Sequence, residues 1–324
     1  MRGWLLALAL LMAAPASAAE PWLTLPPTPT LPKADVSGYA PVNGIRIWYA
    51  EFGSGEPVLF VHGGLANANY FGNQVRALIA EHYKVIVMDS RGHGRSSRNA
   101  ESYGYDLMSS DVLALLDYLK IKRVALVGWS DGAIIGLDIA MHHPERLTRL
   151  FAFAANVDPS GVSDASHSEV VAQYIARAGK EYEKLSPTPT EYQSFLAQIT
   201  DMWNTQPHWT KADFAAIHVR TWIADADHDE MVNHDQPRIM ADWMPDAGLL
   251  IEPEVSHFAF LQNPAQFNAD ILRFLKARLA QNPSDKGFSA RALLVLEARL
   301  ANFSGGLPCR CRCIRHPFPP MRRC

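Results

Sequence analysis

Continuous apolar runs alternate with amphipathic stretches along the first half of the chain. Each run is short and almost wholly apolar, which is typical of strands buried on both faces of a parallel sheet. The stretches between the runs repeat apolar residues at helical spacing. This alternation predicts an α/β fold with a mostly parallel, doubly wound sheet. The expected strands are residues 57–62, 83–89, 123–128 and 147–155, and the expected helices are residues 68–80, 105–119 and 131–142.

The alternation stops after residue 156 and resumes near residue 211. Residues 157–210 contain helical, polar and aromatic stretches but no strand-like run, so we expect a helical cap there. The sheet domain is then expected to comprise residues 37–156 and 211–281. It starts with a hairpin at Asn43-Gly44, a pair favoured in tight turns. Its second half has expected strands at residues 218–224 and 248–252 and expected helices at residues 237–243 and 264–279.

The beginning of the chain has the pattern of an export signal. Arg2 precedes an apolar run at residues 4–14, and Ala16-Ser17-Ala18 offers a cleavage site after it. We therefore expect residues 1–19 to be a signal peptide and the protein to be exported, to the periplasm or outside the cell. Residues 20–36 are proline-rich and are expected to form an extended linker without helix. No other apolar segment approaches the length of a membrane span.

Composition excludes some classes of protein and sets the end of the chain apart. The chain is 48% hydrophobic and 19% charged, with a net charge of −3, so it can bury a large core and lacks the basic character of a nucleic-acid binder. Residues 283–324 nevertheless carry eight Lys/Arg against two Asp/Glu. We expect residues 282–324 to be a basic, disordered tail without a metal centre, because its cysteines match no zinc-site spacing. These are Cys309, Cys311, Cys313 and Cys324.

The segment Gly128-Trp129-Ser130-Asp131-Gly132 lies between an expected buried strand and an expected helix. G-x-S-x-G in this setting is typical of a nucleophile elbow, whose glycines leave room for a strained turn that exposes the serine hydroxyl. In an ordinary turn the same serine would be structural, but the flanking strand and helix favour a nucleophile. The backbone N–H of Asp131 would be one oxyanion donor, and the loop His62-Gly63-Gly64 would supply the other.

A nucleophile elbow requires an acid and a histidine later in the chain. Three aspartates follow the strand expected at residues 218–224, and this position alone leaves Asp225, Asp227 and Asp229 open as the acid. His257 lies after these acids, beyond an expected strand and before the last expected helix. We therefore expect His257 to be the general base.

These motifs, in this order, resemble the α/β-hydrolase superfamily, and the resemblance covers roughly residues 37–280. It implies that Asp229 is the acid, because the family pattern G-D-x-D-x-x-V places its second aspartate there, although Ala226 replaces the usual glycine. It also implies that the second oxyanion donor is the N–H of Gly64, with Leu65 as the next choice. Residues 89–96 resemble the D-x-R-G-x-G-x-S loop of the family.

The resemblance implies catalysis by Ser130, Asp229 and His257 through an acyl-enzyme, with no metal or organic cofactor. We expect an exported serine hydrolase that cleaves carboxylic esters of small, partly hydrophobic substrates, with no nucleic-acid partner. A lactonase, thioesterase, amidase or C–C bond hydrolase, and a non-catalytic binding protein, stay open, as does an action of the basic tail on membranes or anionic polymers. The expected substrate contacts are Leu65, Trp129, Trp203 and Phe258.

The elbow itself is similar to that of valacyclovir-hydrolase-like (biphenyl-hydrolase-like) enzymes, in which the aspartate after the serine lies near the amino group of the substrate. This short resemblance implies that Asp131 would also lie near an amino group of the substrate. Esters of α-amino acids therefore stay open as a minor alternative substrate class.

Overall fold

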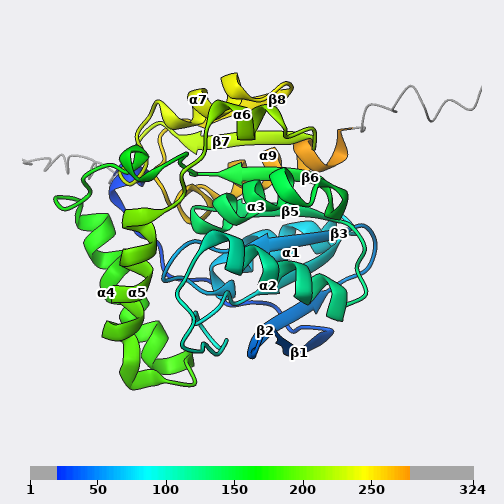
Figure 1. Ribbon diagram of the computed structural model, residues 1–324, viewed down its shortest axis with the longest axis vertical. Helices are drawn as coiled ribbons and strands as arrows, with labels where there is room; N and C mark the ends of the chain where they lie inside the picture. Colours follow the sequence, from blue (N-terminus) through cyan, green and yellow to red (C-terminus); the bar gives the residue numbers. More distant parts are fainter. Residues whose placement is uncertain (1–19, 278–324) are drawn as a thin grey trace, which may run out of the picture. The chain divides into compact units, whose positions relative to one another are not determined.

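The computed structural model of the protein describes residues 20–277 and centres on one eight-stranded sheet (Figure 1). Its strands are β1 Val36–Val42, β2 Ile45–Phe52, β3 Pro57–Val61, β4 Lys84–Met88, β5 Val124–Trp129, β6 Leu147–Phe153, β7 Thr221–Ala226 and β8 Ala247–Glu252. They lie in the order β1-β2-β4-β3-β5-β6-β7-β8. The β1–β2 hairpin and the β2–β4 pair are antiparallel, and the other neighbouring pairs are parallel. The expected α/β fold with a mostly parallel sheet is confirmed.

Helices cover both faces of the sheet (Figure 1). Those of the sheet domain are α1 Gly72–Ala80, α2 Tyr105–Tyr118, α3 Asp131–His142, α6 Lys211–Ala215, α7 Gln236–Trp243, α8 Ala259–Gln262 and α9 Pro264–Lys276. α2 packs against α3, and α1 packs against α9. Since both faces are covered, the central strands have no face left for polar side chains.

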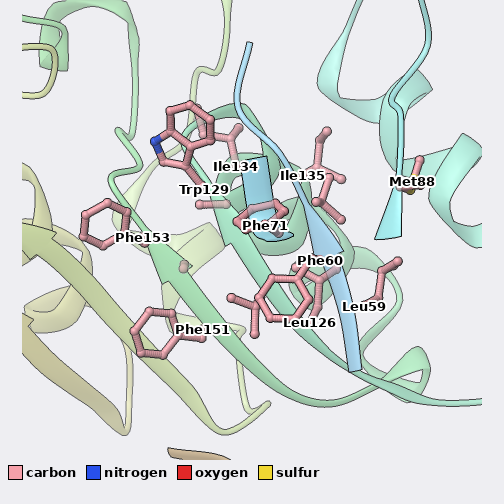
Figure 2. Close-up of a cluster of buried hydrophobic side chains, with 14 of the residues drawn as sticks. Leu59, Phe60, Phe71, Met88, Leu126, Trp129, Ile134, Ile135, Phe151 and Phe153 are labelled. Carbon is pink, nitrogen blue, oxygen red and sulfur yellow. The ribbon is translucent and has the colours of Figure 1, made fainter. Parts of the chain in front are cut away.

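The core lies around the central strands β3 and β5. Every residue of β5 is buried, as are the last four residues of β3. Figure 2 shows apolar side chains clustered around these strands, with the rings of Phe60 and Phe71 at a centroid distance of 4.9 Å. This burial on both faces is the physical reason why the corresponding segments of the sequence are continuous apolar runs.

Two long helices, α4 Glu169–Leu185 and α5 Tyr192–Thr205, lie in the segment between β6 and α6. Figure 1 shows them side by side, standing apart from the layers of the sheet. Ser168 caps α4 by accepting a hydrogen bond from the N–H of Val171. From Val171 onward the buried residues of α4 recur every three or four positions, so one face of the helix is apolar; the buried residues are Val170, Val171, Tyr174, Ala178 and Tyr182. The segment expected to be a cap thus contains two amphipathic helices.

Some element boundaries differ from those expected. β7 begins at Thr221, not at residue 218, because its neighbour β8 begins at Ala247, directly opposite Thr221. The short helix α6 was not expected at all. The last expected helix, residues 264–279, ends at Lys276 within the part of the chain that the structure describes.

The expected signal peptide (residues 1–19) and basic tail (residues 282–324) lie outside the described residues, as do residues 278–281 of the expected sheet domain. The signal peptide and export therefore stay predictions. Within residues 20–277, no helix is long and apolar enough to cross a membrane.

The proline-rich segment before β1 is docked on the domain. It contains one short 3₁₀ turn, Pro21–Leu23, where no helix was expected, and is otherwise irregular. The guanidinium of Arg177, on α4, donates hydrogen bonds to the carbonyls of Leu25 and Pro26 at 2.9 and 2.6 Å. From the sheet domain, Gln262 of α8 donates a hydrogen bond to the carbonyl of Thr24 at 2.9 Å. The segment therefore ties α4 to the sheet domain and is not a free linker.

The close packing of α3 against β3 predicts that Gly132 tolerates no side chain. A Cβ atom on Gly132 would overlap the carbonyl oxygen of Val61, whereas a Cβ on Gly38 would lie 3.8 Å from its nearest neighbour. We expect Gly132→Ala to lower the free energy of unfolding by about 3 kcal/mol and Gly38→Ala to change it by less than about 1 kcal/mol. Urea unfolding of both variants measures the difference, and equal effects would contradict this view of the packing.

Candidate active site

The elbow between β5 and α3 holds Ser130 in a strained conformation. Its backbone has φ 53° and ψ −120°, a left-handed φ that a residue with a side chain adopts only at a cost of about 1–2 kcal/mol. Hydrogen bonds at both of its backbone groups hold this conformation. The N–H of Ser130 donates to Phe153 at 2.8 Å, and its carbonyl accepts from the N–H groups of Ala133 and Ile134 in α3. Ser130 therefore sits at the N-terminus of α3, where the helix dipole favours negative charge.

His257 and Asp229 form a buried hydrogen-bonded pair. The distance from His257 Nδ1 to Asp229 Oδ2 is 2.8 Å, and both side chains are almost wholly inaccessible to solvent. The other oxygen of Asp229 accepts from the N–H groups of Met231 and Val232 at 2.7 and 2.9 Å, so the carboxylate is fixed on both sides. Because Nδ1 is engaged with Asp229, Nε2 is left for the cavity that His257 lines together with Ser130.

The other two candidate acids occupy different places. Asp227 is more than a third exposed, and its carboxylate lies 3.9 Å from His228. Asp225 lies within β7 and is buried. Among these three candidates, the hydrogen bond to His257 belongs to Asp229, the residue that the family pattern indicates.

The two expected oxyanion donors lie beside Ser130. A Cβ on Gly63 would lie 2.9 Å from Cβ of Ser130, and one on Gly64 would lie 2.7 Å from Oδ2 of Asp131. The N–H of Asp131, the first residue of α3, has no partner within its helix. The N–H of Gly64 makes no hydrogen bond to another residue among residues 20–277. Both groups are thus available to a negatively charged oxygen formed near Ser130.

A histidine orients the loop that carries Gly64. His62 Nε2 accepts from the N–H of Ser90 at 3.0 Å, so the proton of the ring is on Nδ1, which donates to the carbonyl of Gly63 at 2.7 Å. The peptide group is planar, and fixing the Gly63 carbonyl therefore fixes the direction of the Gly64 N–H.

Ser130 and His257 open into an apolar cavity of about 370 Å³. Three of the four expected substrate contacts, Leu65, Trp129 and Trp203, line it. Phe258 does not line the cavity. It is fully buried behind it, and the centroid of its ring lies 4.9 Å from that of Tyr174 and 5.6 Å from that of His257. The sequence alternation could not distinguish a lining aromatic residue from a supporting one. Further lining residues, not expected from the sequence, are Tyr105, Asn156, Val162, Tyr174, Ile175, Leu196, Thr200, Gln206, Met231 and Val232.

A profile of the alpha/beta hydrolase family matches residues 58–270. The chain belongs to this family. It is similar to a non-heme haloperoxidase of Rhodococcus erythropolis, with 26% identity over 270 residues that cover 72% of this chain and 97% of the relative. It is also similar to the serine hydrolase BPHL of Mus musculus, with 24% identity over 267 residues that cover 77% of this chain and 90% of the relative.

Solved structures show the same fold. A meta-cleavage product hydrolase from Pseudomonas fluorescens IP01 superposes with a TM-score of 0.65 at 19% identity, covering 74% of this chain and 97% of that one. The names of these three proteins describe different reactions. The reaction of this α/β hydrolase must therefore be argued from its own site.

Two further acids contact the His257–Asp229 pair of this α/β hydrolase. Glu230 accepts hydrogen bonds from the backbone N–H of His257 at 3.2 Å and from Ser256 Oγ at 3.4 Å. The carboxyl of Asp225 is hydrogen-bonded to that of Asp229. Burial, followed by the neighbouring carboxylate of Asp229, raises the pKa of Asp225 well above its usual range. Because the pKa of Asp225 is raised while that of Asp229 is lowered, the proton of the bond between the two carboxyls belongs to Asp225.

The charges around His257 stabilise its protonated form. Burial by itself lowers the pKa of His257, but the carboxylates of Asp229, Glu230 and Asp131 outweigh it, and the net pKa is raised above 6.5. Burial likewise raises the pKa of Asp229, yet His257 and the surrounding hydrogen bonds lower it overall. The pair therefore favours a protonated histidine beside an ionised aspartate, the arrangement that forms when a histidine takes a proton from a serine.

Asp131 brings a negative charge to the wall of the cavity. Tyr105 Oη donates to its Oδ1 at 2.9 Å, and Trp203 Nε1 donates to Oδ1 and Oδ2 at 2.9 and 3.0 Å. Burial raises the pKa of Asp131 to about 6, and the hydrogen bonds from Trp203 and Tyr105 oppose that rise. At pH 7 the carboxylate is mostly ionised. No group of three or more His, Cys, Asp or Glu within the described residues is placed to hold a metal ion.

The assignment of the acid predicts unequal effects of two substitutions. Asp229→Asn would remove the carboxylate that orients His257 and should lower kcat for p-nitrophenyl acetate by roughly 10³–10⁴-fold, as for other serine triads. Asp227→Asn, two residues away and partly exposed, should change kcat by less than about threefold. Steady-state kinetics of both variants test this, and the reverse ranking would make Asp227 the acid.

The raised pKa of His257 predicts the acid limb of the pH profile. As the expected general base, His257 would activate Ser130 only while its ring is neutral, so reactivity should be lost as pH falls through the pKa of this histidine. The rate at which a fluorophosphonate labels Ser130 should therefore fall by half at a pH above 6.5, the ordinary histidine value. Measurement of the labelling rate from pH 5 to 9 tests the direction of the pKa shift of His257, and a midpoint below pH 6.5 would contradict it.

Proposed function

We propose that this α/β hydrolase cleaves carboxylic esters of small, partly hydrophobic molecules through an acyl-enzyme on Ser130. The observation that supports this most directly is that Ser130, held at a strained elbow, opens into the same cavity as His257, whose Nδ1 is bonded to Asp229. This set of groups provides a nucleophile, a general base and an orienting acid.

The proposed reaction has two halves. His257 Nε2 takes the proton of Ser130 Oγ, which forms a bond to the ester carbonyl carbon, and the resulting oxyanion accepts hydrogen bonds from the N–H groups of Gly64 and Asp131. The C–O bond to the alcohol then breaks, and His257 gives its proton to the departing oxygen. A water molecule, deprotonated by His257, attacks the acyl carbon, the bond from that carbon to Ser130 Oγ breaks, and His257 returns the proton to Oγ, which releases the acid and free Ser130.

The cavity favours neutral acyl groups over acidic ones. Its wall is mostly apolar and, within the described residues, includes neither Lys nor Arg. A carboxylate on the substrate would lose its hydration there and would face the ionised Asp131. This charge distribution supports a neutral ester over a substrate with a carboxylate near the cleaved bond.

A second candidate is an ester whose acyl part carries a protonated amino group. It is favoured by one observation: Asp131 is a buried carboxylate beside a cavity without a basic side chain of Lys or Arg among its described residues. An ammonium group would offset its charge, although Trp203 and Tyr105 already donate to both oxygens.

A panel of p-nitrophenyl esters distinguishes these candidates. Pentanoate and glutarate monoesters have the same chain length and differ in one carboxylate, so kcat/KM should be at least about 10-fold higher for pentanoate. Butyrate and 2-aminobutyrate esters differ in one amino group, and a clear preference for the latter would select the second candidate. Matched lactones, amides and vinylogous diketones in the same panel test lactonase, amidase and C–C hydrolase activity.

Substitution of the nucleophile tests the proposal itself. Ser130→Ala should abolish turnover of every ester in the panel and labelling by a fluorophosphonate, while the thermal midpoint stays within a few degrees of wild type. A wild-type protein that neither hydrolyses an ester nor is labelled at Ser130 would instead be a binding protein of this fold.

A further inference from the structure

A hydroxyl from the cap reaches the loop that carries the candidate oxyanion donor. Tyr174 lies on α4, and its O–H donates to the carbonyl of Gly64, 110 residues earlier in the chain. The side chain is buried, and its ring packs against those of Phe258 and Trp129 at centroid distances of 4.9 and 6.0 Å. The hydroxyl is therefore held in place by a packed ring and has little freedom to leave Gly64.

Gly64 has no side chain that could pack against its neighbours, so its position must be held by other residues. A Cβ at this position would overlap the ring of Trp203, so larger residues are excluded. The next residue, Leu65, has φ 66°, in the left-handed region that disfavours residues with side chains. A rotation of the peptide between Gly64 and Leu65 would relieve this strain and move Gly64. The hydrogen bond from Tyr174 to the Gly64 carbonyl opposes that rotation.

Gly64 is thus held by its two flanking peptide groups. On one side His62 holds the Gly63 carbonyl at 2.7 Å, and on the other side Tyr174 holds the Gly64 carbonyl. Because each peptide is planar, the bond at the Gly63 carbonyl sets the direction of the Gly64 N–H, and the bond at the Gly64 carbonyl fixes the following peptide. With both neighbouring peptides fixed, Gly64 between them is held in position. One support comes from the sheet domain and the other from the cap.

The second donor has a support from the cap as well. The carboxylate of Asp131, whose own N–H is the other candidate donor, accepts the Nε1–H of Trp203 on α5 at 2.9 Å. Each of the two helices of the cap therefore contacts one residue of the expected oxyanion hole.

The geometry points to Tyr174 as a positioning residue, which holds the oxyanion donor Gly64 through its carbonyl. Trp203 has the corresponding role at Asp131. The cap is then part of the catalytic apparatus. This inference rests on the proposed acyl-enzyme mechanism. Tyr174 acts on the peptide and not on the reacting atoms, so its hydroxyl contributes when negative charge forms on the carbonyl oxygen and little when the substrate binds.

The test compares two tyrosines of the same helix. Tyr174→Phe removes the hydroxyl that holds Gly64, whereas Tyr182→Phe, the matched control, removes one that bonds Thr188 Oγ1 at 3.0 Å within the cap. For p-nitrophenyl butyrate, Tyr174→Phe should lower kcat by about 10-fold or more with KM changed less than about twofold, since loss of a whole donor costs about 10²–10³-fold. Tyr182→Phe should leave both constants within about twofold of wild type.

An alkylboronic acid supplies a second readout. Its tetrahedral adduct with Ser130 places an oxygen where the oxyanion would form, so its affinity should fall in Tyr174→Phe by about the same factor as kcat. A purely structural role would lower the thermal midpoint or raise KM without this matched loss. If Tyr174→Phe does not fold, Trp203→Phe carries the same comparison at Asp131, with kcat and boronate affinity again expected to fall together.

The possible failures can be told apart. Unchanged kcat and boronate affinity in Tyr174→Phe, in a protein whose Ser130→Ala variant is inactive, would overturn the role of Tyr174 and leave the proposed function standing. A rise in KM alone would also overturn it, because Tyr174 would then be a substrate contact. A wild-type protein that forms no adduct at Ser130 would overturn the proposed function and this inference with it.

Discussion

Helix α3 approaches strands β3 and β5 so closely that only glycine fits at two points of contact. A Cβ on Gly128 would overlap the backbone of Gly132, and one on Gly132 would overlap the carbonyl of Val61. This approach compresses the turn between β5 and α3, and Ser130 takes up the strain with its left-handed φ. The position of the serine beside Gly63, at the start of α3, follows from that packing. His257 and the candidate oxyanion donors can serve a reaction only if they are placed correctly around Ser130.

The second constraint is the burial of several carboxyl groups around one imidazole. Asp229, Glu230 and Asp131 all raise the pKa of His257, while burial lowers it. Burial alone would disfavour the charged histidine that proton transfer creates, so these carboxylates offset a cost that the apolar cavity imposes. Burial and the neighbouring carboxylate of Asp229 raise the pKa of Asp225 well above its usual range, so Asp225 keeps its proton more readily than Asp229 does.

The two helices of the cap contact the rest of the protein at several points. α4 is tied to the proline-rich segment through Arg177 and to the loop that carries Gly64 through Tyr174, and α5 reaches Asp131 through Trp203. The cap also supplies part of the apolar wall, for example Ile175 and Leu196. The lining of the cavity and the supports of the candidate site thus depend on the same two helices. Relatives with the same fold have names that describe different reactions, as expected when function depends on local groups and not on the fold.

The elements whose pattern is local could be predicted from the sequence alone. Buried strands appear as apolar runs, Asn43-Gly44 marks a hairpin, and the two elbow glycines mark the turn at Ser130, because each feature depends on neighbouring residues. Asp229 could be named only through a family pattern, since spacing left three aspartates equal. Three other features became visible only in the folded chain: Phe258 lies behind the cavity, Asp225 is hydrogen-bonded to Asp229, and residues 24–26 are bound to α4 and Gln262. These properties, like the contact of Tyr174 with a glycine 110 residues away, arise from burial and from contacts between distant segments. No periodicity or motif within one segment carries them, because they exist only once the chain has folded.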